Sequence, residues 1–353
     1  MESAIKIKKN LLWALVSFVI AVATVYAIVG QNKGVSFSAV FQLLSRGNKL
    51  FLIGSVICML LFIILEGEAL RITLVSLSDR VSRGNGFMYA SADIYFSAIT
   101  PSATGGQPAC MYFMVKDGLC PCRATASLLL NLLMYNSSIV LIGLVCVIFK
   151  KNIFLSYNTS GKILIVVGLV LLTSLTVFLV LALRKTAWIK AAGMFFIGLF
   201  TKWHLFRHPE KKIQKLNAAL EKYEWASDSL MKNRLLLVKV FFLCLCQRAV
   251  QIGVSAFICL AFGMSPQTAA NVWFAQAYSA IGTNCLPIPG AMGAIDYLMI
   301  NGFEQFMPGD VAVNLELLSR GISFYICVII SLATVIGGHV KRGLIEKKQH
   351  RRE

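Results

Sequence analysis

The sequence is poor in charged residues for its length. Only 14% of its 353 residues are Asp, Glu, Lys or Arg, whereas soluble domains hold about 25%. Hydrophobic residues make up 57% of the chain, and the mean hydropathy is +0.73. These values exclude a soluble enzyme, a disordered chain and a disulfide-stapled secreted domain. The apolar stretches are continuous rather than alternating, which argues against an outer-membrane barrel. We therefore expect an all-α polytopic membrane protein.

The sequence motifs of common catalytic and nucleotide-binding sites are also missing. No Walker A loop, G-x-G-x-x-G, H-E-x-x-H or G-x-S-x-G occurs. The four histidines fall in or near basic stretches, and most of the ten cysteines lie in apolar segments, where Cys behaves as a small hydrophobe. The two C-x-C pairs have no second pair or His at zinc-finger spacing. We expect no cofactor, no metal and no ATP-driven transport by this chain itself.

Long hydrophobic runs are what the sequence does contain. Six are long enough to cross a membrane, at about residues 10–29, 50–70, 124–149, 161–183, 236–262 and 311–340. Two more, 89–115 and 268–306, are broken in the middle by Pro and Gly. Because Pro removes an amide and Gly weakens a helix, neither continues as one helix, and each half is too short to cross alone.

The distribution of positive charge then predicts the topology. The net charge is +18, and the basic residues collect between the apolar runs, which indicates cytoplasmic loops facing anionic lipid rather than nucleic-acid binding. From Arg184 to Lys239 there are twelve Lys or Arg against four acids, and the tail after Val340 is also basic. Both regions and the N-terminus can be cytoplasmic only if neither broken segment crosses the membrane. Segment 89–115 is then a re-entrant hairpin that enters and leaves from the inner face, and segment 268–306 is one that enters and leaves from the outer face.

We therefore expect about six spanning helices and two oppositely oriented re-entrant helical hairpins. The motif Pro101-x-Ala103-x-Gly105 matches Pro289-x-Ala291-x-Gly293, as in the inverted repeats of transporters. The chain forms one integral membrane domain over 1–353, in parts that we list from the N-terminus. These are a first half 1–183, a cytoplasmic amphipathic loop 184–235, a second half 236–340, and a basic cytoplasmic tail 341–353. The loop is expected to contain a helix that begins near Pro209 and lies on the inner leaflet.

The hairpin breaks and the charges inside apolar segments are the candidate site. Amides at a glycine-rich helix start attract anions such as phosphate, although the same glycines would also permit close helix packing. Buried charges are functional candidates because lipid burial is costly; they would pair with one another, or meet a lipid phosphate and a cationic head group. The candidate cavity residues are Asp93, Thr100, Pro101, Thr104, Gly105, Gly106, Gln107, Pro108, Arg248, Pro287, Pro289, Gly290, Gly293, Asp296 and Arg320.

The two broken segments, ITPSATGGQPACMYFM and LPIPGAMGAIDYLMI, resemble the signature pair of the lysylphosphatidylglycerol synthase transmembrane-region family. This is the membrane part of multiple peptide resistance factors and is also found as stand-alone proteins. Its typical elements are T-P-G-G-T-G-G-E-P and P-x-P-G-G-x-G-x-x-E. Gln107 stands where the family usually has Glu, which removes a formal charge, and Asp296 stands at the later acidic position.

The resemblance implies work in the plasma membrane on phosphatidylglycerol and its aminoacylated form, which repels cationic antimicrobial peptides. In full-length members the membrane part is associated with moving that lipid between leaflets. A soluble domain transfers lysine from charged tRNA, and we expect it to be missing here, because thirteen residues follow Val340. The first hypothesis is therefore a lipid translocase. The alternatives are a lysyltransferase and a membrane scaffold for a separate soluble synthase, and the oligomeric state stays open.

Overall fold

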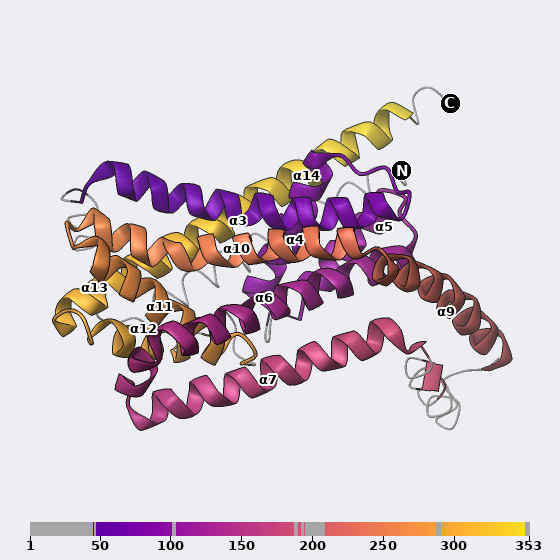
Figure 1. Ribbon diagram of the computed structural model, residues 1–353. Coiled ribbons are helices and arrows are strands. Elements are labelled where there is room, and N and C mark those ends of the chain that lie inside the picture. The colour runs from indigo at the N-terminus through magenta and orange to yellow at the C-terminus, as the bar shows by residue number, and fades with distance from the viewer. Residues whose placement is uncertain are drawn as a thin grey trace.

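The computed structural model describes residues 47–100, 104–186, 209–286 and 293–349, together with residues 45, 190, 191, 194 and 291. All regular structure in these ranges is helical (Figure 1), which confirms the all-α prediction. Five helical runs are long and apolar enough to cross a membrane. They are α3 (Lys49–Ser76), α6 (Pro121–Ser156), α7 (Thr159–Arg184), α10 (Arg234–Ala261) and Gly309–Val340. The sixth expected span, 10–29, lies outside the described residues.

The fifth run is continuous but not uniform. It consists of α13 (Gly309–Arg320), a π-helical turn η3 (Gly321–Ile326) and the start of α14 (Cys327–Gln349). A π-helical insertion widens the helix locally and is frequent at functional sites. Here it follows directly after Arg320, one of the candidate charges.

Asparagine caps mark where three of the long helices begin. The side-chain oxygens of Asn48, Asn158 and Asn233 accept hydrogen bonds from backbone amides in the first turns of α3, α7 and α10, at 3.0, 2.8 and 3.1 Å. Asn is among the preferred N-cap residues because it satisfies an amide that has no partner within the helix. The caps fix these boundaries within otherwise apolar sequence.

The helix is interrupted in both segments that the sequence marks as broken. The first hairpin consists of α4 (Arg83–Ile99) and α5 (Gly106–Lys116), and the second consists of α11 (Pro266–Thr283) and α12 (Ala294–Phe303). At 1.5 Å per residue, the 10-residue α12 and the 11-residue α5 are about 15–17 Å long. Neither reaches across a hydrocarbon core of about 30 Å.

The two hairpins open at opposite ends of the bundle. The connecting helix α9 (Pro209–Lys232) lies at one end, to the right in Figure 1, together with the C-terminal ends of α3, α5 and α7. We call this end the α9 end. The first hairpin begins and ends there. The second hairpin begins directly after α10 at the other end, where the α12 residue Asn301 accepts a hydrogen bond from the Asn158 amide of α7 at 3.3 Å.

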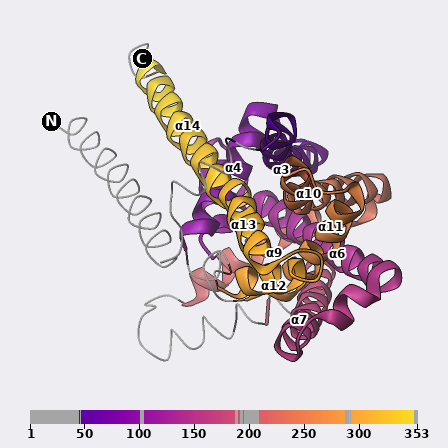
Figure 2. The same cartoon turned by 90° about the vertical axis from the view of Figure 1, so that its left-hand side faces the viewer.

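The order of one long helix, a hairpin and another long helix therefore occurs twice. It runs α3, α4–α5, α6 in the first half and α10, α11–α12, α13–α14 in the second. The two leading helices, α3 and α10, pack side by side (Figure 2). The hairpin helix α4 packs against α3 and α14, and α11 packs against α10, α6 and α7. This arrangement is consistent with the expected inverted repeat.

Glycine allows α3 and α4 to cross with their backbones in contact. A Cβ added to Gly67 would lie 2.8 Å from the Gly86 carbonyl, and one added to Gly86 would lie 2.6 Å from the Gly67 carbonyl. Small residues at helix crossings permit this approach in membrane proteins. The crossing holds the first hairpin against α3, which in turn packs against α10.

The connecting helix α9 is amphipathic and begins at Pro209, as predicted. Its second half docks on the bundle, because Tyr223 and Leu230 are buried against α6, α7 and α10. The Tyr223 hydroxyl donates to the Ala182 carbonyl of α7 at 3.0 Å. This part of the helix therefore rests on protein, not on the lipid surface that the sequence suggests.

Candidate functional site

Four buried polar side chains meet where the first hairpin packs against α3, beside α10. They are Glu66 on α3, Asp93 on α4, and Gln247 and Arg248 on α10, and each is less than 10% exposed. We call them the inner cluster. Charged and amide groups are rarely buried without partners, because removing them from water is costly. The contacts of each member therefore define what the cluster can do.

Asp93 lies at the junction of the two half-helices. Its Oδ2 accepts a hydrogen bond from Nε2 of Gln107, in the first turn of α5, at 3.0 Å, and its Oδ1 accepts from the Ser97 hydroxyl at 3.4 Å. The carboxyl group of Asp93 also interacts electrostatically with that of Glu66. Gln107, where the resemblance expects Glu, thus supplies a donor to Asp93. The second acidic group comes from α3 instead.

Glu66 is a site residue that the sequence analysis missed. Its Oε2 accepts a hydrogen bond from Nε2 of Gln247 at 3.1 Å. The expected span 50–70 ends close to Glu66, and the following Glu68 and Arg71 form a local ion pair at 2.6 Å, so Glu66 resembled a boundary residue. Because α3 continues to Ser76, Glu66 lies inside the helix bundle. The rule that buried charges are functional candidates would have found it.

Arg248 is held by an aromatic ring and neutral amides. Its guanidinium carbon lies 3.4 Å from the centre of the Tyr135 ring, in the range of a cation–π contact. Nη1 donates to Gln251, and Nη2 donates to Oδ1 of Asn284 at 3.3 Å. Asn284 directly follows α11, so Arg248 connects the inner cluster to the second hairpin. It also attracts the Glu66 carboxylate electrostatically.

A second cluster of like composition lies in the other half of the chain. Asp296 caps α12 by accepting from the Gly293 amide at 3.0 Å, and it pairs with Arg320 at 3.0 Å. Glu316, buried on α13, contacts Asp296. The sequence analysis offered Asp296 with an arginine as one pairing, and the partner is Arg320. Glu316 was missed because it stands in a mixed polar stretch rather than a clean apolar run.

The described glycines of the candidate site act mainly in packing and capping. A Cβ on Gly105 would lie 2.5 Å from Cγ2 of Thr100, and the Gly105 amide donates to the Thr100 hydroxyl at 2.9 Å. That amide is therefore engaged within the protein, as the packing alternative predicts. Gly293 has a positive φ of 77°, which favours glycine.

The remaining candidates fall in two groups. Thr104 and Pro108 lie at the exposed start of α5, where a proline is tolerated because the first-turn amides have no helical acceptor. Pro101, Pro287, Pro289 and Gly290 lie outside the described residues.

An ion pair at the α9 end ties the first hairpin to α14. Arg342 donates from Nε and Nη2 to the two carboxylate oxygens of Asp117, at 2.6 and 2.5 Å. The Tyr89 hydroxyl of α4 donates to the same carboxylate at 2.6 Å. Burial raises the pKa of Asp117, but the hydrogen bonds from Arg342 and Tyr89 outweigh it and hold the pKa below its ordinary value. Bidentate pairs of this kind are among the stronger polar contacts.

We expect Asp117→Asn to cost about 1–3 kcal/mol of stability at neutral pH. A carboxyl whose pKa is depressed in the folded state contributes stability above its unfolded pKa of about 3.9, and loses it as the pH falls through the folded value. The wild type should therefore lose stability in acid while the variant loses less. Thermal unfolding in detergent at neutral and acid pH measures both. Asp228→Asn, which breaks the exposed Asp228–Lys232 pair at 3.0 Å, is the control and should change little.

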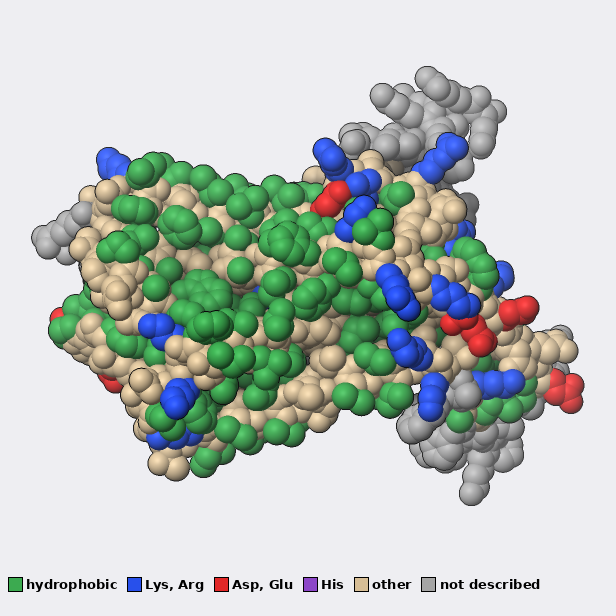
Figure 3. Space-filling model, viewed as in Figure 1, with side chains coloured by type: hydrophobic (Ala, Val, Ile, Leu, Met, Phe, Trp, Pro, Cys, Tyr) green, Lys and Arg blue, Asp and Glu red, His purple; other side chains and the backbone are tan. Residues whose placement is uncertain are grey.

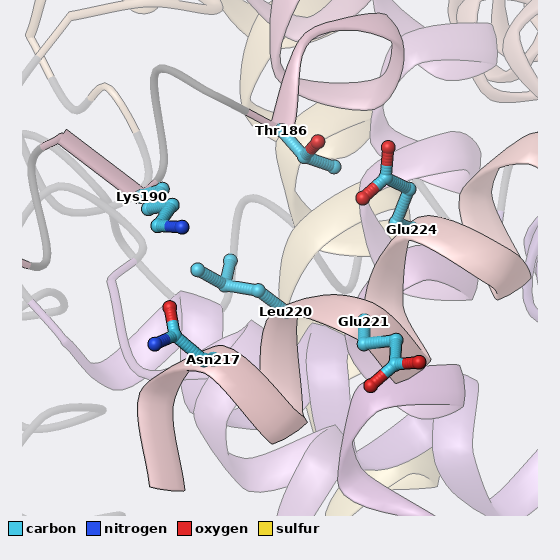
Figure 4. Close-up of a pocket in the computed structure, with 6 residues that line it drawn as sticks. All are labelled: Thr186, Lys190, Asn217, Leu220, Glu221 and Glu224. Atoms are coloured by element: carbon cyan, nitrogen blue, oxygen red, sulfur yellow. The ribbon is translucent and has the colours of Figure 1, made fainter. Parts of the chain in front are cut away.

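A separate cavity of about 310 Å³ lies beside α9 (Figure 4). It is lined by Thr186, Lys190, Asn217, Leu220, Glu221 and Glu224. Two glutamates against one lysine make it a poor site for a phosphate group. We assign it no role.

The chain matches a known protein family over most of its length. The family is described as the lysylphosphatidylglycerol synthase TM region, and the match covers residues 13–331. The chain belongs to this family. The match includes both hairpins and both polar clusters, so the resemblance drawn from the two broken motifs is confirmed. Among curated proteins, no sequence matches the chain. As a family member with five described candidate spans, it is a multi-pass membrane protein.

Proposed function

We propose that this protein moves an aminoacylated phosphatidylglycerol, or a related phospholipid, between the leaflets of the cell membrane. Membership of the lysylphosphatidylglycerol synthase family supports the lipid class. The observation that carries the proposal is the inner cluster, which places two carboxyl groups and an arginine in the bundle between two opposed hairpins. Such charges within a membrane protein mark a pathway more often than a scaffold.

The proposed orientation places the α9 end in the cytoplasm, with α4–α5 and α11–α12 as re-entrant hairpins from the inner and outer faces. Lys and Arg side chains gather at the α9 end, while a broad apolar band covers the middle of the molecule (Figure 3). The described basic residues there include Arg80, Arg83, Arg123 and Arg234. This bias is the one expected for cytoplasmic loops. Both termini would then be cytoplasmic.

The chemistry of the inner cluster suits a head group that carries both positive and negative charges. Lysyl-phosphatidylglycerol carries two ammonium groups and one phosphate, so it presents both signs of charge. The carboxyl groups of Glu66 and Asp93 would take an ammonium group, and Arg248 would take the phosphate, for which guanidinium is well suited. The cluster is buried in the described conformation, so the head group would enter when the first hairpin moves relative to α10.

Reconstituted liposomes provide the test. Lysyl-phosphatidylglycerol is confined to the inner leaflet, and a membrane-impermeant amine reagent reports its arrival outside. We expect the wild type to label faster than empty liposomes. Asp93→Asn should slow labelling by at least about tenfold, the loss typical of one charge-assisted contact of 1.4 kcal/mol or more. The matched control is Glu68→Gln, which removes the carboxylate of the nearby Glu68–Arg71 ion pair. Liposomes with this variant should label at the same rate as those with the wild type.

The other hypotheses give different results in parallel assays. Lysyl-lipid formation from charged tRNA by the purified chain would support a transferase. Co-purification of a soluble synthase, lost when residues 186–234 are altered, would support a scaffold. Labelling no faster than in empty liposomes, with folded protein, would rule out translocation of this lipid.

A further inference from the structure

The charges of the inner cluster do not balance unless it holds a proton. Glu66 and Asp93 bring two negative charges when both are ionised, and Arg248 brings one positive charge. Among the described residues, the other titratable groups that interact with the pair are thiols, Cys110 on α5, Cys244 on α10 and Cys327 on α14. Thiols in apolar surroundings stay neutral. One added proton makes the cluster neutral, which avoids the cost of net charge inside a membrane protein.

The contact between the two carboxyl groups also indicates that the cluster holds one proton. The carboxyl groups of Glu66 and Asp93 are both buried and interact electrostatically, and two ionised carboxylates would repel each other there. Adjacent carboxyl groups resolve this by sharing one proton. Gln107 donates to the Asp93 carboxyl at 3.0 Å and Gln247 donates to the Glu66 carboxyl at 3.1 Å, so a neutral amide holds each carboxyl in place.

Two further polar atoms at the cluster lack partners. Oε1 of Gln247 and Nε of Arg248 are buried and have no hydrogen-bond partner among the described residues. Gln247 is fully buried and Arg248 is 5% exposed. The Gln247 side chain contacts Glu66 through Nε2, so its unpaired Oε1 also lies within the cluster and could accept a hydrogen bond from an ammonium group. Nε of Arg248 could donate a hydrogen bond to a phosphate oxygen. The two groups of the lipid would therefore satisfy one unpaired atom each.

We infer that Glu66 and Asp93 form a single-proton site and that the cationic head group of a lipid displaces this proton. The O–H bond of the shared acid breaks, its electron pair stays on the carboxylate, and the proton leaves to water as the ammonium group takes its place. Lysyl-phosphatidylglycerol has a net charge of +1, so exchange for one proton is electroneutral. The proton site follows from the charges and contacts of the inner cluster, whereas its coupling to lipid rests on the proposed function.

A proton is the cation that the donor set favours. No group of three or more His, Cys, Asp or Glu side chains placed to hold a metal ion occurs in the described part of the chain. Sodium needs several oxygen ligands, whereas the cluster offers two carboxyl groups, and a glutamine amide already holds each of them.

Infrared spectroscopy of the purified protein tests the proton site without transport. At neutral pH the wild type should show the C=O stretch of a carboxylic acid, and difference spectra should show its loss in Glu66→Gln and also in Asp93→Asn. Each variant leaves one carboxylate and Arg248 in the cluster, a pair that is neutral without a proton. Glu68→Gln should leave the band unchanged. The second cluster, which pairs Asp296 with Arg320 beside Glu316, contributes its own band, so the readout is the loss of intensity relative to the wild type. A difference spectrum without this loss in either cluster variant would overturn the inference, and so would the absence of any such band from the wild type.

Liposomes with a pH gradient test the coupling. For one-to-one exchange, a gradient of one pH unit should shift the steady-state ratio of lysyl-phosphatidylglycerol between leaflets by about tenfold. Lipid that moves with a ratio independent of the gradient would overturn the coupling and leave the proposed function intact. An infrared band without any lipid movement would instead overturn the proposed function and leave the proton site. A ratio that follows a sodium gradient would replace the proton by sodium.

Discussion

Arg248→Gln is expected to lower the free energy of unfolding by about 3–5 kcal/mol at neutral pH, the cost of breaking a buried charge cluster by removing one partner. Arg248 is 5% exposed and is, among the described residues, the cation that interacts with the Glu66 carboxyl group of the cluster. Without it, the shared proton no longer makes the cluster neutral, and a second proton must bind. Thermal unfolding in detergent measures the loss.

The pH dependence of this variant distinguishes charge from packing. Acid supplies the second proton, so the deficit of Arg248→Gln relative to the wild type should shrink as the pH falls. A loss due only to the missing contact with the Tyr135 ring would stay constant. The control is Arg71→Gln, which breaks a half-exposed pair with Glu68 and should cost less than about 1 kcal/mol. Equal losses in the two variants would refute the charge account.

Hydropathy and helix breakers predicted most of the fold. Five of the six expected spans appear as long helices, and α4 and α5 separate between Ile99 and Gly106, where Pro and Gly interrupt the run. These features are local, because a missing amide or a side-chain-free residue acts on its own turn of helix. The docking of α9 was not predicted, since an amphipathic face looks the same whether it covers lipid or protein.

The candidate site was predicted less completely, for a physical reason. Asp93, Arg248, Asp296 and Arg320 stand out because each interrupts an apolar run. Their partners do not stand out: Glu66 lies four residues before the expected end of its span. Which groups meet depends on how α3 packs against α4 and α10, and that crossing is set by contacts far apart in the sequence. Gln107 illustrates both sides of this limit. Its departure from the family pattern is visible in the sequence, but its hydrogen bond to Asp93 is visible only in the structure.

Gly106→Ala is expected to reduce lipid movement by at least about tenfold and to cost about 1–3 kcal/mol of stability, the usual range for overpacking. An added Cβ would lie 2.6 Å from the Asp93 carbonyl and would also overlap the Asp93 carboxylate and the Ser97 hydroxyl. A backbone carbonyl inside α4 does not move alone, so the start of α5 must shift. That shift would separate Gln107 from Asp93, which are 3.0 Å apart.

Gly253→Ala is the matched control for this substitution. Gly253 lies within α10, five residues after Arg248, and a Cβ added there meets no described heavy atom within 4 Å. Alanine favours a helix over glycine by up to about 1 kcal/mol, so this variant should be as stable as the wild type or slightly more stable, with unchanged lipid labelling. Because both changes add the same single methyl group to a helix, a difference between them isolates the junction of α4 and α5. Equal labelling rates would remove that junction from the proposed mechanism, even if the protein still moves lipid.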